Sequence, residues 1–173
     1  EDQNFYSHAG VDFTGVARAV LVNLKNLGSS RRLVGASTIT QQVAKNFLLT
    51  NEVSWRRKVK EAILAFRIER AFPKERILEL YLNEIYLGFG SYGVAAAALN
   101  YFYKSLNELT IAETAYLAAL PKAPNNYHPF KKHKAAKIRR NWVIERMRID
   151  GTVSAEDAAA ATEKPLEVYT RAE

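Results

Sequence analysis

The sequence predicts an all-α fold, built of helices that are joined by short loops. No run alternates apolar and polar residues in the manner of a strand, and no internal repeat is present. Apolar residues recur at helical spacing between Ser or Thr caps and Gly or Pro stops. Residues 62–68, AILAFRI, are apolar on nearly every face, which is typical of the buried centre of an all-α domain. With 173 residues, 48% of them apolar, the chain is long enough for one core.

The first half of the chain contains four predicted helices, each with a recognisable start or stop. They are expected within residues 11–27, 38–49, 55–72 and 73–88. Their predicted N-caps are Asp12, either Ser37 or Thr38, and Ser54. Their predicted stops are Gly28, Pro73 and Gly88, of which Pro73 also suits the first turn of the next helix. Residues 28–37, rich in Gly and Ser, are expected to form a mobile loop.

The second half continues in the same pattern. Helices are expected over residues 91–106, 111–120 and 131–150, with a short one inside 154–173. Four consecutive alanines in the first of these allow close approach of a neighbouring helix. Thr110 and Glu113 form a T-x-x-E capping box, and Pro121 and Pro124 follow the helix that it opens. Gly151 closes the basic helix, and the Pro-containing end of the chain resembles a linker to a further domain.

Composition limits the classes of function. The chain has no cysteine, so disulfides, thiolate metal sites and a cysteine nucleophile are excluded. The formal net charge of +7 favours anionic partners such as nucleic acid, anionic lipid or a phosphorylated substrate. No apolar run reaches the length of about 18 residues that a membrane-spanning helix needs. Because the first residue is not Met, we expect the chain to be a processed or excised piece.

The stretch RRKVKE, residues 56–61, places three charges on one helical face. Arg57 and Glu61 are separated by four positions, and Lys58 and Glu61 by three. One interpretation is a surface ladder of ion pairs, worth about 0.2–0.5 kcal/mol per pair. The other is a charged turn at the end of a buried helix, where charges line a cleft or pair with one another.

The stretch GASTITQQVAKN, residues 35–46, gathers polar side chains at a helix start. Gln41 and Lys45 share a face close to free backbone N–H groups, which suits a sugar or a phosphate. Ordinary capping by Ser37 or Thr38 is the alternative interpretation. Two adjacent glutamines, Gln41 and Gln42, would need polar partners inside a core, and this favours a binding role.

Other charged groups leave several alternatives open. Glu1 and Asp2 are either a solvated terminus or a catalytic acid or base held against the apolar Phe5 and Tyr6. The histidines lack metal-binding spacing, and Asn83, one turn after Glu79, is a weak signal. The basic stretch 131–148 is a nucleic-acid surface, a solvated face or a surface apposed to anionic lipid.

Taken together, these stretches resemble one family. The segment EDQNFYSHAG is similar to its E-D-x-x-F-x-x-H-x-G motif, and GASTITQQVAKN, RRKVKE, KERILELYLNEIYLGFGSYG and RRNWV match its other motifs in order. The family is the peptidoglycan glycosyltransferases, glycosyltransferase family 51, found in bifunctional class A penicillin-binding proteins and in monofunctional transglycosylases. The resemblance runs to about Gly151 and implies a lysozyme-like fold with a large lobe and a small, membrane-facing jaw lobe. It therefore implies a glycosyltransferase domain over residues 1–151, with a C-terminal helix and the start of a linker over 152–173.

The resemblance also implies an activity and a set of site residues. The activity is polymerisation of lipid II into β-1,4 glycan strands, with inversion at the donor anomeric carbon and release of undecaprenyl pyrophosphate. Glu1 resembles the catalytic base and Glu61 the second essential carboxylate. Substrate-binding roles fall on Asp2, Ser37, Thr38, Gln41, Gln42, Lys45, Arg57, Lys58 and Asn83. A divalent cation such as Mg²⁺, bound with the substrate pyrophosphate, is the expected cofactor, without a dedicated protein metal site.

The implied partners are lipid II, the nascent strand, membrane lipid, a linked transpeptidase domain and other cell-wall synthesis proteins, but not nucleic acid. The implied location is the periplasmic or extracellular side of the bacterial cytoplasmic membrane, with an anchor upstream of Glu1. A lytic transglycosylase or lysozyme-like enzyme, which cleaves finished glycan, is the alternative. The sequence departs from the family pattern at Val53, where an Arg is frequent, and at Tyr103, where a Gly is usual.

Overall fold

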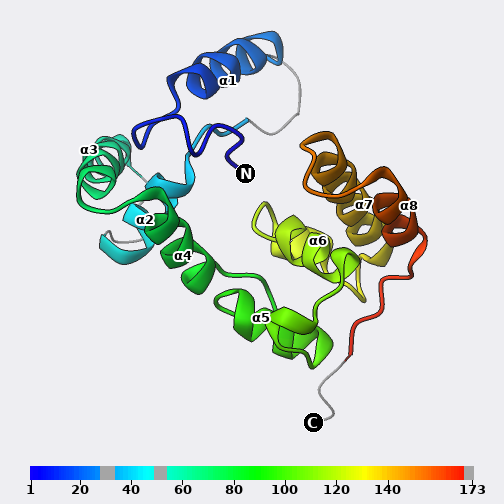
Figure 1. Ribbon diagram of the computed structural model, residues 1–173. Helices are drawn as coiled ribbons and strands as arrows, with labels where there is room; N and C mark the ends of the chain where they lie inside the picture. Colours follow the sequence, from blue (N-terminus) through cyan, green and yellow to red (C-terminus); the bar gives the residue numbers. More distant parts are fainter. Residues whose placement is uncertain (28–33, 49–53, 170–173) are drawn as a thin grey trace. The chain divides into compact units, whose positions relative to one another are not determined.

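The computed structural model describes residues 1–27, 34–48 and 54–169 (Figure 1). The described residues form eight α-helices and no strand, apart from an isolated antiparallel bridge between Tyr86 and Tyr92, so the predicted all-α class is confirmed. The chain divides into two compact units, Glu1–Tyr81 and Leu82–Glu173. The predicted domain division at residue 151 stays a prediction.

The first unit contains α1 (Phe13–Lys25), α2 (Ile39–Leu48), α3 (Trp55–Ala71) and most of α4 (Lys74–Glu84). The predicted caps Asp12 and Ser54 accept hydrogen bonds from the backbone N–H groups of Gly15 and Arg57, at 2.9 and 3.2 Å. Helix α2 packs against α3. The predicted stop at Gly28, most of the loop after it, and Val53 lie outside the described residues.

The expectation that residues 62–68 form the buried centre is wrong. Ala65 is fully buried, but Ile63 and Phe66 are 48% and 37% exposed. Four apolar side chains of α3 share one exposed stripe at helical spacing: Trp55, Val59, Ile63 and Phe66. The helix therefore directs much of its apolar surface outward, while its buried positions include the charged Glu61.

The second unit contains α5 (Val94–Phe102), α6 (Ile111–Ala119), α7 (His133–Ile149) and α8 (Ala155–Glu163), with short 3-10 turns at Leu106–Glu108 and Pro124–Tyr127. Helix α6 packs against α5, α7 and α8. Small side chains let these helices approach closely: Ala112, Ala115, Ala158 and Ala161 form a core cluster with Ile144. The Thr110–Glu113 capping box that opens α6 is confirmed.

Two of the predicted helices differ from the observed ones by three or more residues at an end. Helix α4 ends at Glu84 rather than at residue 88, and α5 spans Val94–Phe102 rather than 91–106. Gly93 has φ +80°, and a Cβ there would lie 2.3 Å from the carbonyl oxygen of Asn83, so the backbone turns where no other residue fits. Tyr103 caps α5 in the left-handed region, the conformation that explains why Gly is usual at this position. None of the described helices is both long enough and apolar enough to cross a membrane.

Candidate active site

The start of the chain is tied to α2 by Asp2 and His8. The backbone N–H of Gly10 donates to His8 Nδ1 at 3.0 Å, so Nε2 carries the ring proton and donates to the Asp2 carboxylate at 3.0 Å. The same carboxylate accepts the backbone N–H of Ile39, the first residue of α2, at 2.9 Å. A carboxylate at a helix N-terminus is stabilised by the partial positive charge of the helix dipole there. Because the Asp2 side chain is almost wholly buried, this geometry suits positioning of the segment that carries Glu1.

Thr38 makes the second connection between these segments. Its hydroxyl donates to the carbonyl of Gly10 at 2.6 Å and accepts the backbone N–H of Gln41 at 3.1 Å. The Gln41 side-chain oxygen in turn accepts the backbone N–H of Thr38 at 3.0 Å, which completes a capping box. Thr38, rather than Ser37, is therefore the N-cap of α2. The Thr38 hydroxyl and the Gln41 side-chain oxygen belong to buried residues and take part in the capping that the sequence left as an alternative to binding.

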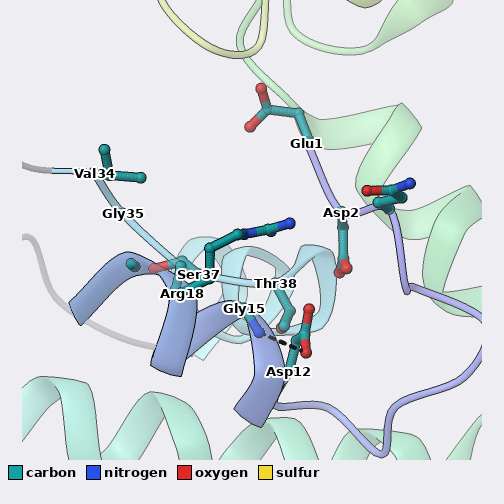
Figure 2. Close-up of a pocket in the computed structure, with 12 residues that line it drawn as sticks. Glu1, Asp2, Asp12, Gly15, Arg18, Val34, Gly35, Ser37 and Thr38 are labelled. Carbon is teal, nitrogen blue, oxygen red and sulfur yellow. Dashed lines mark hydrogen bonds between the residues drawn. The ribbon is translucent and has the colours of Figure 1, made fainter. Parts of the chain in front are cut away.

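A small pocket of about 80 Å³ opens between the chain start, α1 and residues 34–38 (Figure 2). Its lining includes the exposed Glu1, together with Arg18 and Ser37. Phe5, which the sequence predicted as an apolar wall beside Glu1, is buried, and its ring contacts Tyr6 and His8. Glu1 thus borders a pocket that also presents a guanidinium group and a hydroxyl group.

Lys58 joins this pocket to the charged turn of α3. Its Nζ donates to Ser37 Oγ at 3.2 Å and also to the Glu61 carboxylate. Glu61 is 1% exposed, and its other oxygen lies 3.1 Å from Arg57 Nε, within ion-pair distance but without hydrogen-bond alignment. Lys58 itself is 52% exposed. The buried carboxylate thus holds two cations, one of which is exposed and bonds to Ser37 of the pocket lining, so the charges of this turn are paired with one another.

Lys74 supports the chain start from the other side. Its Nζ donates to the carbonyl of His8 at 2.6 Å and to Glu69 at 2.7 Å, and lies 4.5 Å from the centroid of the Phe5 ring. Glu69 also accepts the hydroxyl of Thr40 at 2.6 Å. Hydrogen bonds from α2 and the start of α4 therefore converge on the N-terminal segment, and Glu69 of α3 links these two helices.

Three of the predicted site residues lie outside this network. Lys45 is exposed on α2 and pairs with no carboxylate of the described residues, and Gln42 is half-buried on the same helix. Asn83 is exposed near the end of α4, in the second unit, and is not brought to the pocket by any described contact. Glu79, one turn earlier on the same helix, pairs with Arg76 at 2.7 Å on the surface.

Two groups were missed by the sequence reasoning. Arg18 lines the pocket three residues after Gly15, a helical spacing that places both on one face of α1. Tyr81 is buried, and its hydroxyl has no hydrogen-bond partner among the described residues. Burial raises the pKa of Tyr81 strongly, and the negative charges of Glu1 and Asp2 raise it further, so this hydroxyl stays protonated and available as a donor.

The carboxylates of the site do not form a metal cage. Within the described ranges, no three His, Asp or Glu side chains gather closely enough to hold a metal ion. Asp2 is occupied by His8 and Ile39, and Glu61 by Arg57 and Lys58. The donor set of the described residues therefore does not fit a resident metal.

Comparisons with known proteins agree on one family. Residues 1–148 match the transglycosylase family. The chain is 56% identical over 171 residues to penicillin-binding protein 1A of Rickettsia bellii, covering 99% of the chain and 22% of the relative. It is 51% identical to penicillin-binding protein 1A of Aquifex aeolicus, covering 97% of the chain and 23% of that relative. The chain thus spans about a fifth of the length of these relatives.

A solved structure supports the same assignment. The crystal structure of penicillin-binding protein 1A from Haemophilus influenzae aligns with a TM-score of 0.55 and 37% sequence identity. The alignment covers 78% of this chain and 17% of that one.

Proposed function

This chain belongs to the transglycosylase family, which makes it a peptidoglycan glycosyltransferase domain, and we propose that its first compact unit binds lipid II and polymerises it into β-1,4 glycan strands. One observation carries the proposal: Ser37 belongs to the pocket that Glu1 lines and accepts a hydrogen bond from Lys58 of the Glu61 turn. A carboxylate and a cluster of cations therefore border one continuous polar surface, although they come from sequence segments that lie far apart.

Glu1 is the proposed general base. Its carboxylate is exposed and has oxygen atoms that can accept a proton from a bound hydroxyl group. It takes the proton of the 4-hydroxyl group of the acceptor N-acetylglucosamine as that oxygen attacks C1 of the donor N-acetylmuramic acid. The C1–O bond to the pyrophosphate breaks, its electron pair leaves with the phosphate oxygen, and the new bond forms with inversion from α to β.

The proposed role of the cations is to stabilise the negative charge of the departing pyrophosphate. Lys58 presents an ammonium group to solvent beside Ser37, and Arg18 lines the same pocket. Glu61 orients Lys58 and Arg57, so its contribution is positional. We include Lys45 as a further pyrophosphate ligand, since its exposed ammonium group is free of the described carboxylates.

We propose that a divalent cation is bound mainly by the substrate and not by a metal site of the protein. Because Asp2 and Glu61 are already paired, a cation such as Mg²⁺ would be held mainly by the pyrophosphate oxygens. The steps described above are performed by the side chains of the chain alone.

Exposed apolar surface on the first unit supports a location at the membrane. The stripe on α3 is flanked by the exposed basic residues Arg56, Lys60, Arg67 and Arg70. Helix α1 also exposes a set of apolar side chains: Phe13, Val20, Leu21 and Leu24. Apolar residues beside Lys and Arg suit a helix lying in the headgroup region of an anionic membrane. We therefore propose the periplasmic or extracellular side of the bacterial cytoplasmic membrane, with a membrane anchor and a transpeptidase domain elsewhere in the full-length protein.

The proposal is tested by Glu1→Gln in the full-length protein, so that no free amino group lies beside residue 1. Polymerisation of lipid II should be lost while binding of lipid II is largely kept, because the amide preserves the shape but cannot accept the proton. Glu156→Gln, at an exposed glutamate of α8, is the matched control and should retain activity. Normal turnover by Glu1→Gln would refute the assignment, and shortening of finished glycan by the wild-type protein would favour the lytic alternative.

A further inference from the structure

The loop between α4 and α5 contains a strained aromatic residue. Gly88, Phe89 and Gly90 have φ values of +86°, +53° and +66°, which places a phenylalanine in the left-handed region between two glycines. The turn is closed by hydrogen bonds from Leu87 N to Ser91 O and from Ser91 N to Gly88 O, at 2.9 and 2.8 Å. Such a conformation at a bulky residue is costly and persists only where the surrounding structure enforces it. Here it leaves the Phe89 ring 48% exposed.

Phe89 belongs to a group of three neighbouring rings, which we call the aromatic platform: Phe89, His128 and Phe130. The ring centroids are 5.0 Å apart for Phe89 and His128, and about 6 Å apart for the other two pairs. Phe130 is 47% exposed and His128 is half-buried. The buried Tyr101 supports Phe89 from below at 5.6 Å, with its hydroxyl donating to the carbonyl of Leu87. The platform is therefore held rigidly within the second unit.

His128 adds a directed hydrogen-bond donor to this surface. The backbone N–H groups of Phe130 and Lys131 both donate to His128 Nδ1, each at 3.2 Å. The ring proton therefore lies on Nε2, which has no acceptor among the described residues. Burial first, and then the charge of Lys131, lowers the pKa of His128, so the ring is neutral at neutral pH and keeps this tautomer.

We propose that the aromatic platform binds the growing glycan strand after it leaves the catalytic pocket. Aromatic faces carry negative partial charge and attract the polarised C–H bonds on the face of a pyranose ring. The His128 N–H suits a sugar hydroxyl or an acetamido oxygen. The inference rests on the proposed function, because the product of that function is an N-acetylated polymer whose peptide side groups carry carboxylates.

The rim of the platform supports a glycan rather than an apolar partner. Exposed amides lie beside it at Asn125 and Asn126, the latter accepting a hydrogen bond from Lys132 at 3.2 Å. Lys131 and Lys132 are exposed and complement the carboxylates of peptide side groups on the strand. Rings, amides and ammonium groups together make a polar saccharide site with apolar stacking faces.

Two variants test the platform, and both are compatible with the fold. Phe89→Gly removes a ring at a position whose backbone favours glycine, so its melting temperature should not fall substantially below that of the wild type. Phe130→Ala removes an exposed ring. Trp142→Ala, at an exposed ring on α7, is the matched control, and Phe130→Trp should preserve binding because it retains an aromatic face.

The measurement is fluorescence anisotropy of soluble, uncross-linked glycan strands with the full-length protein, alongside lipid II polymerisation. Phe89→Gly and Phe130→Ala should each bind strands about tenfold more weakly. They should also release shorter strands at an unchanged initial rate of lipid II consumption. Unchanged strand binding in both variants, or loss of binding to anionic vesicles with strand binding intact, would overturn the inference. Failure of the proposed function would give a different result: the wild type would not polymerise lipid II, or Glu1→Gln would still polymerise it.

Discussion

Thr38→Val is the most direct test of how the candidate site is assembled. Valine has nearly the shape of threonine, so the substitution removes one buried hydroxyl without opening a cavity. The hydroxyl caps α2 at Gln41 and binds the carbonyl of Gly10. Gly10 cannot move to find another partner, because a Cβ there would already lie 2.9 Å from the backbone of Ala65.

The expected cost follows from these two bonds. Loss of a Thr N-cap destabilises a helix by about 1 kcal/mol. A buried carbonyl left without a donor costs about 1–3 kcal/mol more. We therefore expect the free energy of unfolding to fall by about 2–4 kcal/mol. Because the same bond holds the segment that carries Glu1, the rate of lipid II polymerisation should fall as well.

Urea denaturation followed by circular dichroism measures the first effect, and initial rates of lipid II consumption measure the second. Thr38→Ser retains the hydroxyl and should recover most of both losses. Thr152→Val is the control, since its exposed hydroxyl also donates to a backbone carbonyl, at 2.8 Å from Met147 O, yet makes no contact with the site. If Thr38→Val unfolds within about 0.5 kcal/mol of the wild type, the proposed bridge between Gly10 and α2 does not contribute as argued.

Three further outcomes are expected. Lys45→Ala should raise KM for lipid II and also lower kcat without changing the melting temperature, because a cation that binds the pyrophosphate in the ground state interacts more strongly as negative charge develops in the transition state; an unchanged kcat/KM would contradict its role. Lys74→Met should destabilise the chain by about 3 kcal/mol in urea denaturation, since Glu69 is left as a buried, poorly paired carboxylate; wild-type stability would refute this pairing. Burial raises the pKa of Glu113, but hydrogen bonds from Lys104 and the α6 cap outweigh it, so the net pKa lies below 4.5. The stabilisation from Glu113 is therefore present above the unfolded pKa and lost as pH falls through the folded pKa. The melting temperature of Glu113→Gln should fall less steeply than that of the wild type between about pH 5 and pH 3. An equally steep fall in both proteins would exclude this linkage.

Local signals in the sequence predicted most of the helices. Asp12, Ser54 and the Thr110–Glu113 box act on backbone groups within three residues, so their effect is visible in the sequence itself. The ends of α4 and α5 were not predictable in the same way. They depend on the positive φ of Gly93 and Tyr103, conformations set by the packing of the turn rather than by helix propensity.

The candidate site was predictable where its residues are neighbours on one helix. The spacing of Arg57, Lys58 and Glu61 indicated their pairing, and the structure brings them together. The bond from Lys58 to Ser37, 21 positions earlier, depends on tertiary packing and has no sequence signal. The burial of residues 62–68 was overestimated for a related reason. An apolar pattern does not distinguish a helix face that packs in the core from an apolar face that stays exposed on the surface.

The exposed apolar faces of the first unit raise the question of what keeps this unit in shape. Several of its large apolar side chains face outward on α1 and α3, while the start of the chain is held by buried polar contacts through Asp2, Thr38 and Lys74. Polar contacts of this kind fix geometry more strictly than apolar packing, since each needs a particular donor and acceptor. The position of Glu1 therefore depends on a few hydrogen bonds rather than on a large core. Such a unit can expose apolar surface to lipid and still present its carboxylate at a defined place beside the pocket.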